Sequence, residues 1–186
     1  MVCLQFFSSL GGKWQGNRKK YYSESFLMKI LVTGGAGFIA SHVAKAYIQD
    51  GHEVTVVDNL STGFLKNVPE GADFIEADVT PDAMDRIIQD GEFDLINHHA
   101  AQISVRVSVE DPVKDAELNI LSTIRLLNLS VKYGVKHFVF ISSGGAMYGE
   151  QEYFPADEKH LQRPASPYGI TKMTGEHYCR FFSETY

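Results

Sequence analysis

The sequence predicts an α/β fold, a doubly wound parallel sheet with helices on both faces. Three observations lead to this prediction. Apolar stretches of strand length alternate with amphipathic stretches of helical period from residue 29 to the end of the 186-residue chain. Two helical stretches begin at a capping residue followed by proline, and two end at glycine. The first apolar stretch leads directly into a glycine-rich turn at 34–37.

Strands are expected where short apolar runs lack helical spacing. Five such runs follow one another, at residues 30–32, 53–58, 73–78, 93–97 and 137–142. A complete dinucleotide-binding sheet of this architecture has six strands. We therefore expect an incomplete sheet, truncated after about five strands, whose last apolar edge and one face lack cover.

Helices are expected between these strands. Four helices are expected: the first at 38–50, the second beginning at 80–81, the third at 111–134, and the fourth from 167 to the end. The third carries an apolar stripe of Ile120, Ile124, Leu127 and Val131, which is the spacing of a buried helix face. Gly134 is a suitable C-terminal residue for that helix.

Composition limits the possible functions. The formal net charge of −6 disfavours nucleic acid as a partner, because such partners usually require a basic face. No apolar run approaches the ~18 residues of a membrane span. Cys3 and Cys179 form neither a disulfide framework nor a metal-ligand spacing, which favours a reducing, cytoplasmic location.

Residues 1–27 differ from the rest of the chain. They combine Gly11-Gly12, the basic run 18–20 and scattered aromatic residues without clear periodicity. A signal peptide would place its basic residues before its apolar run, whereas here the apolar residues come first. We expect a non-native or disordered leader, such as an upstream start or a cloning remnant, with Met28 as the functional start. A disordered tail with a binding role is the alternative.

The glycine-rich turn is the strongest functional signal. It follows a strand and opens a helix, which is the context that a loop holding a dinucleotide pyrophosphate requires. Gly34 permits the tight turn, and Gly37 lets backbone N–H groups approach the phosphates. Ala40 takes the third position of the motif, where a small residue allows close packing of helix and strand. A glycine-rich turn without a ligand is the alternative.

Two aspartates follow the next strands. Asp58 ends the second strand, 21 residues after Gly37, where a carboxylate would accept hydrogen bonds from the adenosine ribose. The same charge would repel a 2′-phosphate, so Asp58 favours NAD over NADP. A turn-capping aspartate is the alternative. Asp78, near the end of the third strand, is either a cap or a neighbour of the adenine.

Tyr168 and Lys172 form a candidate catalytic pair. Residues four apart share one face of a helix, so the phenol and the ammonium are expected side by side. A neighbouring cation favours the phenolate, and this predicts a lowered pKa for Tyr168 and a role as general acid and base. An ordinary exposed pair is the alternative. The location of this helix, after the fifth strand, favours the catalytic interpretation.

The ends of the fourth and fifth strands carry further candidates. Ser142 and Ser143 lie where a hydroxyl could bind a reacting alcohol, although they could also be a polar strand end. His98 and His99 are adjacent in a strand and so point to opposite faces, which argues against a shared metal ion. The small residues 100–101 would let a flat cofactor lie against the chain.

Together these motifs resemble the extended short-chain dehydrogenase/reductase family, and within it the NAD-dependent epimerase/dehydratase branch. The resemblance covers roughly residues 28–186, and its motifs read TGGAGFIASH, VVDNLSTG, ADVT, NHHAAQISVRVSVEDP, SSGGAMYGE and SPYGITK. It implies a Rossmann fold that binds NAD and is here cut off before a C-terminal substrate domain.

The resemblance also implies roles for individual residues. Tyr168 would be the catalytic base, and Lys172 would hold the nicotinamide ribose and tune Tyr168. Contacts to the cofactor would follow the chain order: the pyrophosphate at Gly34, Gly37, Phe38 and Ile39, the ribose at Asp58 and Asn59, the adenine at Asp78 and Val79, and the nicotinamide half at Ala100, Ala101, Gln102 and Asn119. Ser142 would complete this set.

One segment departs from the family pattern. The family usually places its catalytic Ser or Thr four residues before the tyrosine of the strand-end motif, and Gly144 occupies that position before Tyr148. Ser143 is the nearest hydroxyl. Sugar dehydratases of the branch place acidic residues just after the Ser or Thr, whereas this chain has Gly145 and Ala146, which disfavours dehydration.

The activity implied by the resemblance is 4-epimerisation of a nucleotide-sugar, above all UDP-glucose and UDP-galactose, through a transient 4-keto sugar. The alternatives are another nucleotide-sugar epimerase, dehydratase or decarboxylase of the branch, or an NAD-binding module without turnover. Relatives pair through the two helices after the fourth and fifth strands, so a homodimer is expected of the full-length form.

Overall fold

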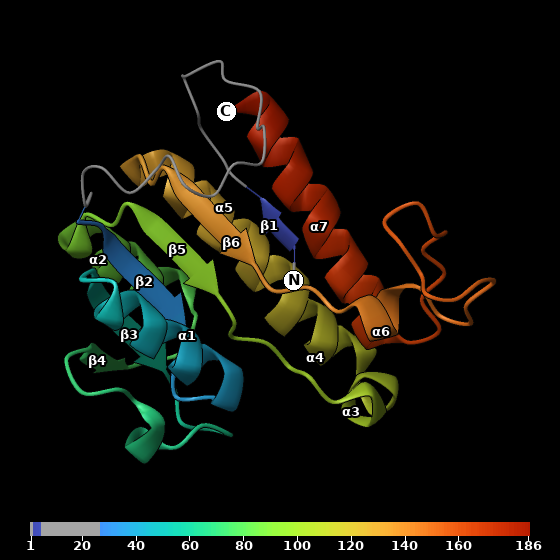
Figure 1. Cartoon of the computed structure of the whole chain (residues 1–186), viewed down its shortest axis with the longest axis horizontal. Coiled ribbons are helices and arrows are strands. Elements are labelled where there is room, and N and C mark those ends of the chain that lie inside the picture. The colour runs from blue at the N-terminus through green and yellow to red at the C-terminus, as the bar shows by residue number, and fades with distance from the viewer. Residues whose placement is uncertain (1, 5–26) are drawn as a thin grey trace.

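The computed structural model describes residues 2–4 and 27–186, and these form an α/β layered structure around one sheet (Figure 1). The strand order is β1-β6-β5-β2-β3-β4. Five strands run parallel, as the sequence predicts: β2 (Lys29–Thr33), β3 (Glu53–Asp58), β4 (Asp73–Glu76), β5 (Leu95–His98) and β6 (His137–Phe140). Their carboxyl ends therefore meet at a single edge of the sheet.

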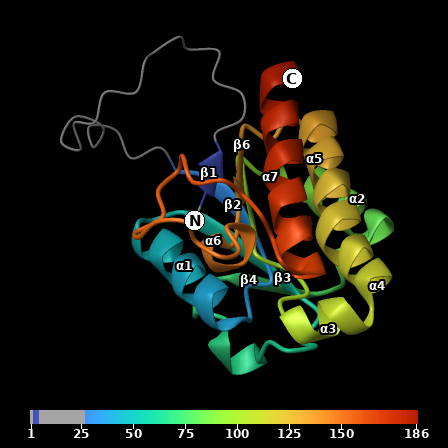
Figure 2. The ribbon, with the colours of Figure 1, turned by 90° about the vertical axis from the view of Figure 1, so that its right-hand side faces the viewer.

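Helices cover both faces of the sheet, which confirms the doubly wound prediction (Figure 2). Helix α1 (Phe38–Gln49) packs on one face, where Ala40 and Ala44 contact Ile30 and Val32 of β2. Helices α2 (Pro81–Gly91), α5 (Ser122–Tyr133) and α7 (Pro167–Thr185) pack on the other face. Their buried core includes Leu126 of α5 and Phe138 of β6.

The long helix after β5 contains a local irregularity that its apolar stripe does not reveal. It consists of α4 (Pro112–Ala116), the π-helical segment η2 (Glu117–Leu121) and α5. Asp111 caps α4 through its side chain, and Gly134 ends α5 in the left-handed conformation with φ of 70°. Both ends therefore agree with the sequence prediction.

Three short helical elements were not predicted from the sequence: η1 (Leu65–Asn67), α3 (Val105–Glu110) and α6 (Gly144–Met147). They are at most six residues long, so each offers less than two turns of hydrophobic periodicity from which to recognise a helix. Helix α6 matters for the site because Ser143 is its N-cap residue.

The outer edge of β6 is paired by the strand β1 (Val2–Leu4), which runs antiparallel to it. The register places Cys3 opposite Val139. The expectation of an unpaired edge at β6 is therefore wrong over these three residues, because a segment from the opposite end of the chain supplies the hydrogen-bonding partner (Figure 1). The prediction that residues 1–27 are a non-native or disordered leader concerns mostly residues outside the described part and stays a prediction.

Candidate cofactor and catalytic site

The predicted site residues gather at the carboxyl edge of the parallel strands. This is the edge at which open α/β sheets bind ligands, because the loops that leave neighbouring strands diverge there. The glycine loop follows β2, Asp58 ends β3, Ala100 follows β5, and Ser143 follows β6. Tyr168 and Lys172 come from the first turns of α7, whose start returns to the same edge.

The glycine loop contacts the segment after β5 directly. Gly34 has φ of 70°, and a Cβ atom there would lie 2.7 Å from the backbone nitrogen of Ala100. Glycine is therefore required both by the backbone conformation and by the close approach. Helix α1 then begins at Phe38, and both Phe38 and Ile39 are exposed, at 78% and 63%. Their first-turn N–H groups have no intrahelical acceptor and point toward the site edge.

Asp58 connects two backbone segments. Its Oδ2 atom accepts a hydrogen bond of 3.0 Å from the Ala36 N–H of the glycine loop, and its Oδ1 atom accepts one of 2.8 Å from the Leu60 N–H. The second bond is the turn-capping interaction considered above. A carboxylate offers about four acceptor positions, so capacity remains for a ribose hydroxyl.

The next two predicted residues bind each other. Asn59 donates a hydrogen bond from Nδ2 to Oδ1 of Asp78, and its own Oδ1 accepts one from the Ser61 N–H. Thr80, rather than Asp78, is the N-cap residue of α2. Val79 is half-buried and packs against the core beneath α2 and α5. The ribose and adenine candidates therefore lie together beside the glycine loop.

His98 and His99 have different environments. His98 is buried between Phe138 and Phe140, its Nδ1 lies 2.7 Å from Thr33 Oγ1, and burial lowers its pKa to about 3. His99 is half-buried, and burial together with the charge of Lys172 lowers its pKa to about 4. Both side chains are therefore neutral at pH 7. No cluster of three His, Cys, Asp or Glu side chains suited to a metal ion occurs within the described residues.

Gln102 and Asn119 are brought together, but their polar atoms already have partners. Asn119 Oδ1 accepts from the Gln102 N–H at 2.9 Å, and Asn119 Nδ2 donates to the Gln102 carbonyl at 2.9 Å. The Gln102 side chain contacts Ser104 and Asp115. These contacts fix the segment after Ala101 in place, which sequence reasoning did not anticipate.

Tyr168 and Lys172 share one face of α7, as predicted. Ser166 caps this helix by accepting from the Gly169 N–H, and Pro167 takes its first position. The Lys172 ammonium lies 5.9 Å from the Tyr168 ring centroid and 4.9 Å from that of Phe140. It donates a hydrogen bond of 2.9 Å to the Ile141 carbonyl at the end of β6.

The predicted pKa of Tyr168 needs a correction. Burial raises this pKa above its ordinary value, and the negative charge of Asp115 raises it further, whereas a hydrogen bond with Ser143 lowers it. Spacing along a helix reveals the neighbouring cation but not the loss of hydration, and here the loss of hydration is the larger effect. Lys172 is 5% exposed, and burial lowers its pKa to about 8.

Ser143 is the hydroxyl whose side chain lowers the pKa of Tyr168. That Ser143 takes the role of the family's serine or threonine, one position before the usual slot, stays a prediction. Gly144, which occupies that slot, begins helix α6. Ser142 donates instead to the sulfur of Met147, at 3.0 Å.

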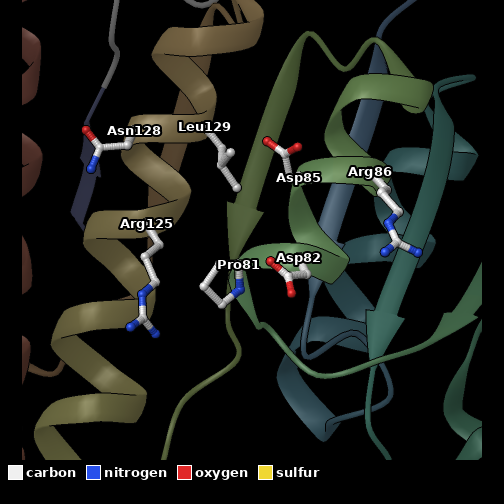
Figure 3. A pocket seen from close by; sticks show the side chains of 7 residues that line it. All are labelled: Pro81, Asp82, Asp85, Arg86, Arg125, Asn128 and Leu129. Atoms are coloured by element: carbon white, nitrogen blue, oxygen red, sulfur yellow. The ribbon is translucent and has the colours of Figure 1, made fainter.

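A groove elsewhere on the molecule is unrelated to these residues. It lies between α2 and α5, has a volume of about 430 Å³, and is lined by Pro81, Asp82, Asp85, Arg86, Arg125, Asn128 and Leu129 (Figure 3). Asp85 forms an ion pair of 2.7 Å with Lys132 next to it. None of the predicted site residues lines this groove.

The residues at the strand edge fit a dinucleotide such as NAD. At Gly34 the glycine loop packs directly against the backbone of Ala100, with no room for a side chain between them. First-turn N–H groups of α1 are available for an anion on one side. On the other side, the Nε2 atom of His99 is buried without a hydrogen-bond partner in the described structure. The fold and this site together define a doubly wound protein of the dinucleotide-binding class with a tyrosine–lysine pair.

Comparisons with known proteins identify the family. The model of the NAD dependent epimerase/dehydratase family matches residues 30–186. A putative UDP-glucose 4-epimerase of Methanocaldococcus jannaschii is 45% identical over 157 residues, which are 84% of this chain and 52% of that protein. The chain belongs to the NAD dependent epimerase/dehydratase family.

Solved structures agree with this assignment. The UDP-glucose 4-epimerase of Thermotoga maritima with UDP-glucose is 46% identical, with a TM-score of 0.83 over 86% of this chain and 52% of that one. The complex of the Thermus thermophilus UDP-glucose 4-epimerase with NAD is 45% identical, with a TM-score of 0.82 and the same coverage. The chain thus spans about half the length of the relatives that it matches. No helix within the described residues is long and apolar enough to cross a bilayer.

Proposed function

We propose that this chain is the NAD-binding half of a nucleotide-sugar 4-epimerase that interconverts UDP-glucose and UDP-galactose in the cytoplasm. One observation carries the proposal: the Lys172 ammonium lies 5.9 Å from the Tyr168 ring centroid, and the Ser143 side chain lowers the pKa of Tyr168, at the edge that holds the glycine loop. A protein that only binds a dinucleotide has no need of a buried ammonium next to a phenol. The relatives with bound NAD and UDP-glucose support both ligands.

In this proposal the phosphates lie against the glycine loop at Gly34, Gly37, Phe38 and Ile39. Asp58 and Asn59 take the adenosine ribose, Asp78 and Val79 flank the adenine, and Lys172 takes the nicotinamide ribose. Bound NAD supplies a hydride acceptor when oxidised and a hydride donor when reduced. The carboxylate of Asp58 favours NAD over NADP, since a 2′-phosphate would meet its charge.

Proton transfer is assigned to Tyr168. Its oxygen takes the proton of the sugar 4-hydroxyl as the hydrogen on carbon 4 leaves as hydride, and a 4-keto sugar results. Tyr168 returns the proton when the opposite face of the keto group is reduced. The Ser143 side chain favours the phenolate by lowering the pKa of Tyr168, against the larger opposing effect of burial, and the Lys172 ammonium lies 5.9 Å from the ring centroid. Gly145 and Ala146 provide no acid or base for dehydration.

The first experiment measures cofactor binding by the whole chain. Calorimetric titration is expected to show binding of NAD and much weaker binding of NADP. Addition of UDP-glucose to the NAD-loaded protein then tests for reduced nicotinamide by its near-ultraviolet absorbance. Failure to bind NAD would contradict the proposal.

The second experiment tests the role of Tyr168 in a protein that includes the substrate half. Tyr168→Phe is expected to slow epimerisation by about 10²- to 10⁴-fold, the usual contribution of general acid–base catalysis, with little change in NAD affinity. Tyr186→Phe makes the same change at the exposed C-terminal end of α7 and serves as the control. Equal rates for the two variants would contradict a catalytic role of Tyr168 and favour the alternative, an NAD-binding module without turnover.

We also propose that the full-length protein is a homodimer that pairs through two neighbouring helices. Exposed apolar residues follow the outer side of both: Leu118 and Leu121 on η2, and Ile170, Tyr178 and Phe181 on α7. We call these five residues the helical stripe. The two helices lie side by side on one face of the sheet (Figure 2), and apolar surface of this kind favours association.

A further inference from the structure

Asp115 is a fully buried carboxylate on α4, with 0% of its surface exposed. Within the described residues it forms no ion pair. A buried charge is costly unless hydrogen bonds replace its lost hydration, so Asp115 is an unusual residue for a merely structural position. The family comparison and the proposed mechanism give it no role.

Three side chains from three segments donate to this carboxylate. Gln102 Nε2, after β5, lies 2.7 Å from Oδ1, and Asn119 Nδ2, on η2, lies 3.1 Å from the same oxygen. Thr171 Oγ1, on α7, lies 3.0 Å from Oδ2. Asp115 thus joins the segment after Ala101 to the helix that carries Tyr168 and Lys172.

Thr171 is the link on the side of α7. It lies directly before Lys172, and its single hydroxyl proton has two acceptors in reach, Asp115 Oδ2 at 3.0 Å and the Tyr168 carbonyl at 2.9 Å. It also accepts from Asn119 Nδ2 at 3.2 Å. A hydroxyl held from three directions fixes the rotation of the first turns of α7 about the helix axis.

The irregular segment η2 supports the same interpretation. Asn119 lies inside this π-helical turn and binds Asp115, Thr171 and the backbone of Gln102 at once. Thr123 Oγ1 donates to the Asn119 carbonyl at 2.7 Å, which helps satisfy a backbone group where the helix widens. Single π-helical turns inside α-helices occur frequently at functional sites.

We propose that Asp115 is a positioning residue: its accepted hydrogen bonds hold the Tyr168–Lys172 face of α7 against the loop at Ala100–Gln102, so that both sides of the cofactor site keep one geometry. This inference rests on the proposed function, because it assigns Asp115 to the same NAD site. It adds that the geometry of the pair depends on a residue that touches neither cofactor nor substrate.

The charge of Asp115 acts in addition to its hydrogen bonds. It raises the pKa of the buried Lys172, which opposes the larger lowering caused by burial. It also raises the pKa of Tyr168. The other ionisable groups that interact electrostatically with Lys172 are His98, His99 and Cys179.

Substitutions separate the two effects. In Asp115→Asn the amide oxygen can accept from Gln102 and Asn119, while its NH₂ group donates to Thr171, which keeps its proton for the Tyr168 carbonyl. The hydrogen-bonded network therefore survives without the charge. Asp115→Ala removes both. Thr171→Val breaks only the link to α7, and Thr171→Ser restores it.

The experiment measures NAD affinity by calorimetry and the pKa of Lys172 by NMR of its ε-carbon, in the whole chain below its unfolding temperature. Thr171→Val and Asp115→Ala are expected to weaken NAD binding about tenfold or more, and Thr171→Ser to restore it. Asp115→Asn should keep affinity within about threefold while lowering the Lys172 pKa below that of the wild type. Thr174→Val is the matched control, since Thr174 bonds only the Ile170 carbonyl one turn along the same helix.

The outcomes distinguish the two proposals. A wild-type chain without NAD affinity overturns the proposed function, and the Lys172 pKa then still reports the coupling to Asp115. If NAD binds but Thr171→Val behaves like Thr174→Val, the positioning role is overturned. It is also overturned if Asp115→Asn is as severe as Asp115→Ala, because the charge alone would then be responsible. If Asp115→Ala does not fold, the NAD affinities of Thr171→Val and Thr171→Ser, compared with that of Thr174→Val, test the positioning role.

Discussion

At the scale of single residues, Asp58 shows how one side chain can serve structure and recognition together. Its two oxygens hold the Ala36 and Leu60 N–H groups, which fixes the glycine loop relative to the turn after β3. The negative charge that remains at the edge is what would distinguish NAD from NADP. The two roles can be separated because one depends on hydrogen bonding and the other on charge.

We predict that Asp58→Asn narrows the preference for NAD over NADP by about tenfold or more, equivalent to about 1.4 kcal/mol. One amide oxygen still accepts a hydrogen bond, so stability falls only slightly. Asp58→Ala should narrow the preference equally and lower stability by roughly 1–3 kcal/mol, since two N–H groups lose their acceptor. Calorimetry and denaturant unfolding measure both effects. Asp73→Asn, at the opposite, exposed end of β4, is the control, and an unchanged preference in Asp58→Asn would contradict the assignment.

Lys172 illustrates the opposite relation, in which function opposes stability. Its folded pKa is about 8, against 10.5 for the free side chain. Between these pH values the unfolded chain holds a proton that the folded chain has lost, so stability rises with pH there. Below pH 8 the cost of burying the Lys172 ammonium is fully present and lowers the free energy of unfolding by roughly 3 kcal/mol, as expected for a pKa shift of this size.

Lys172→Met is therefore expected to raise the free energy of unfolding at pH 7 by roughly 2–3 kcal/mol, because an apolar chain fills the site without the charge. The advantage over the wild type should shrink as pH approaches 10. NAD affinity should fall at the same time. Denaturant unfolding of both proteins at pH 7 and pH 9.5 checks the sign, and a variant that is less stable than the wild type at pH 7 would refute this account of the burial.

At the scale of elements, the end of α5 depends on one glycine. Gly134 has φ of 70°, accepts the left-handed conformation, and its N–H together with that of Val135 closes the helix on the carbonyls of Val131 and Ser130. No atom lies within 4 Å of the position where a Cβ would stand. The cost of a side chain there is therefore purely conformational.

We predict that Gly134→Ala lowers the free energy of unfolding by about 1 kcal/mol, the usual penalty for alanine in the left-handed region. Gly145→Ala is the matched control, because a Cβ there also meets no neighbour and its φ is not positive. Alanine within helix α6 should be neutral or slightly stabilising. Thermal or denaturant unfolding measures the difference, and equal stabilities of the two variants would contradict it.

The elements also show what the sequence can reveal. The strands, α1, α5 and α7 follow from local periodicity and caps, so residues such as Pro167 and Gly134 predicted helix ends well, whereas the capping role of Ser166 came from the structure. The raised pKa of Tyr168 and the Asp115 network did not follow, because Thr171 lies 56 residues from Asp115 and burial is a property of the assembled fold. Ser143 was suspected as a substitute hydroxyl, and its effect on the pKa of Tyr168 became evident only in the assembled structure.

At the scale of the whole molecule, the proposals assign binding roles to two surfaces, the carboxyl edge of the sheet and the helical stripe. The carboxyl edge of the sheet faces the substrate in the proposed function. The helical stripe consists of exposed residues of η2 and α7, and α7 lies on the face of the sheet opposite to α1 (Figure 2). Association through the stripe would leave the NAD edge of each copy open, because the two surfaces belong to different sides of α7.

We predict that a protein comprising this chain and the substrate half sediments at twice its monomer mass at micromolar concentration, and that Leu118→Glu combined with Phe181→Glu makes it a monomer. Each substitution would place a carboxylate in an apolar contact, at a cost of several kcal/mol when desolvated. Phe64→Glu is the control, since Phe64 is exposed at 62% outside the stripe. Analytical ultracentrifugation distinguishes the species. A monomeric wild type, or a dimer that persists in the double variant, would exclude the stripe as the interface; NAD affinity should stay unchanged in both variants, because the stripe and the cofactor edge do not share a side chain.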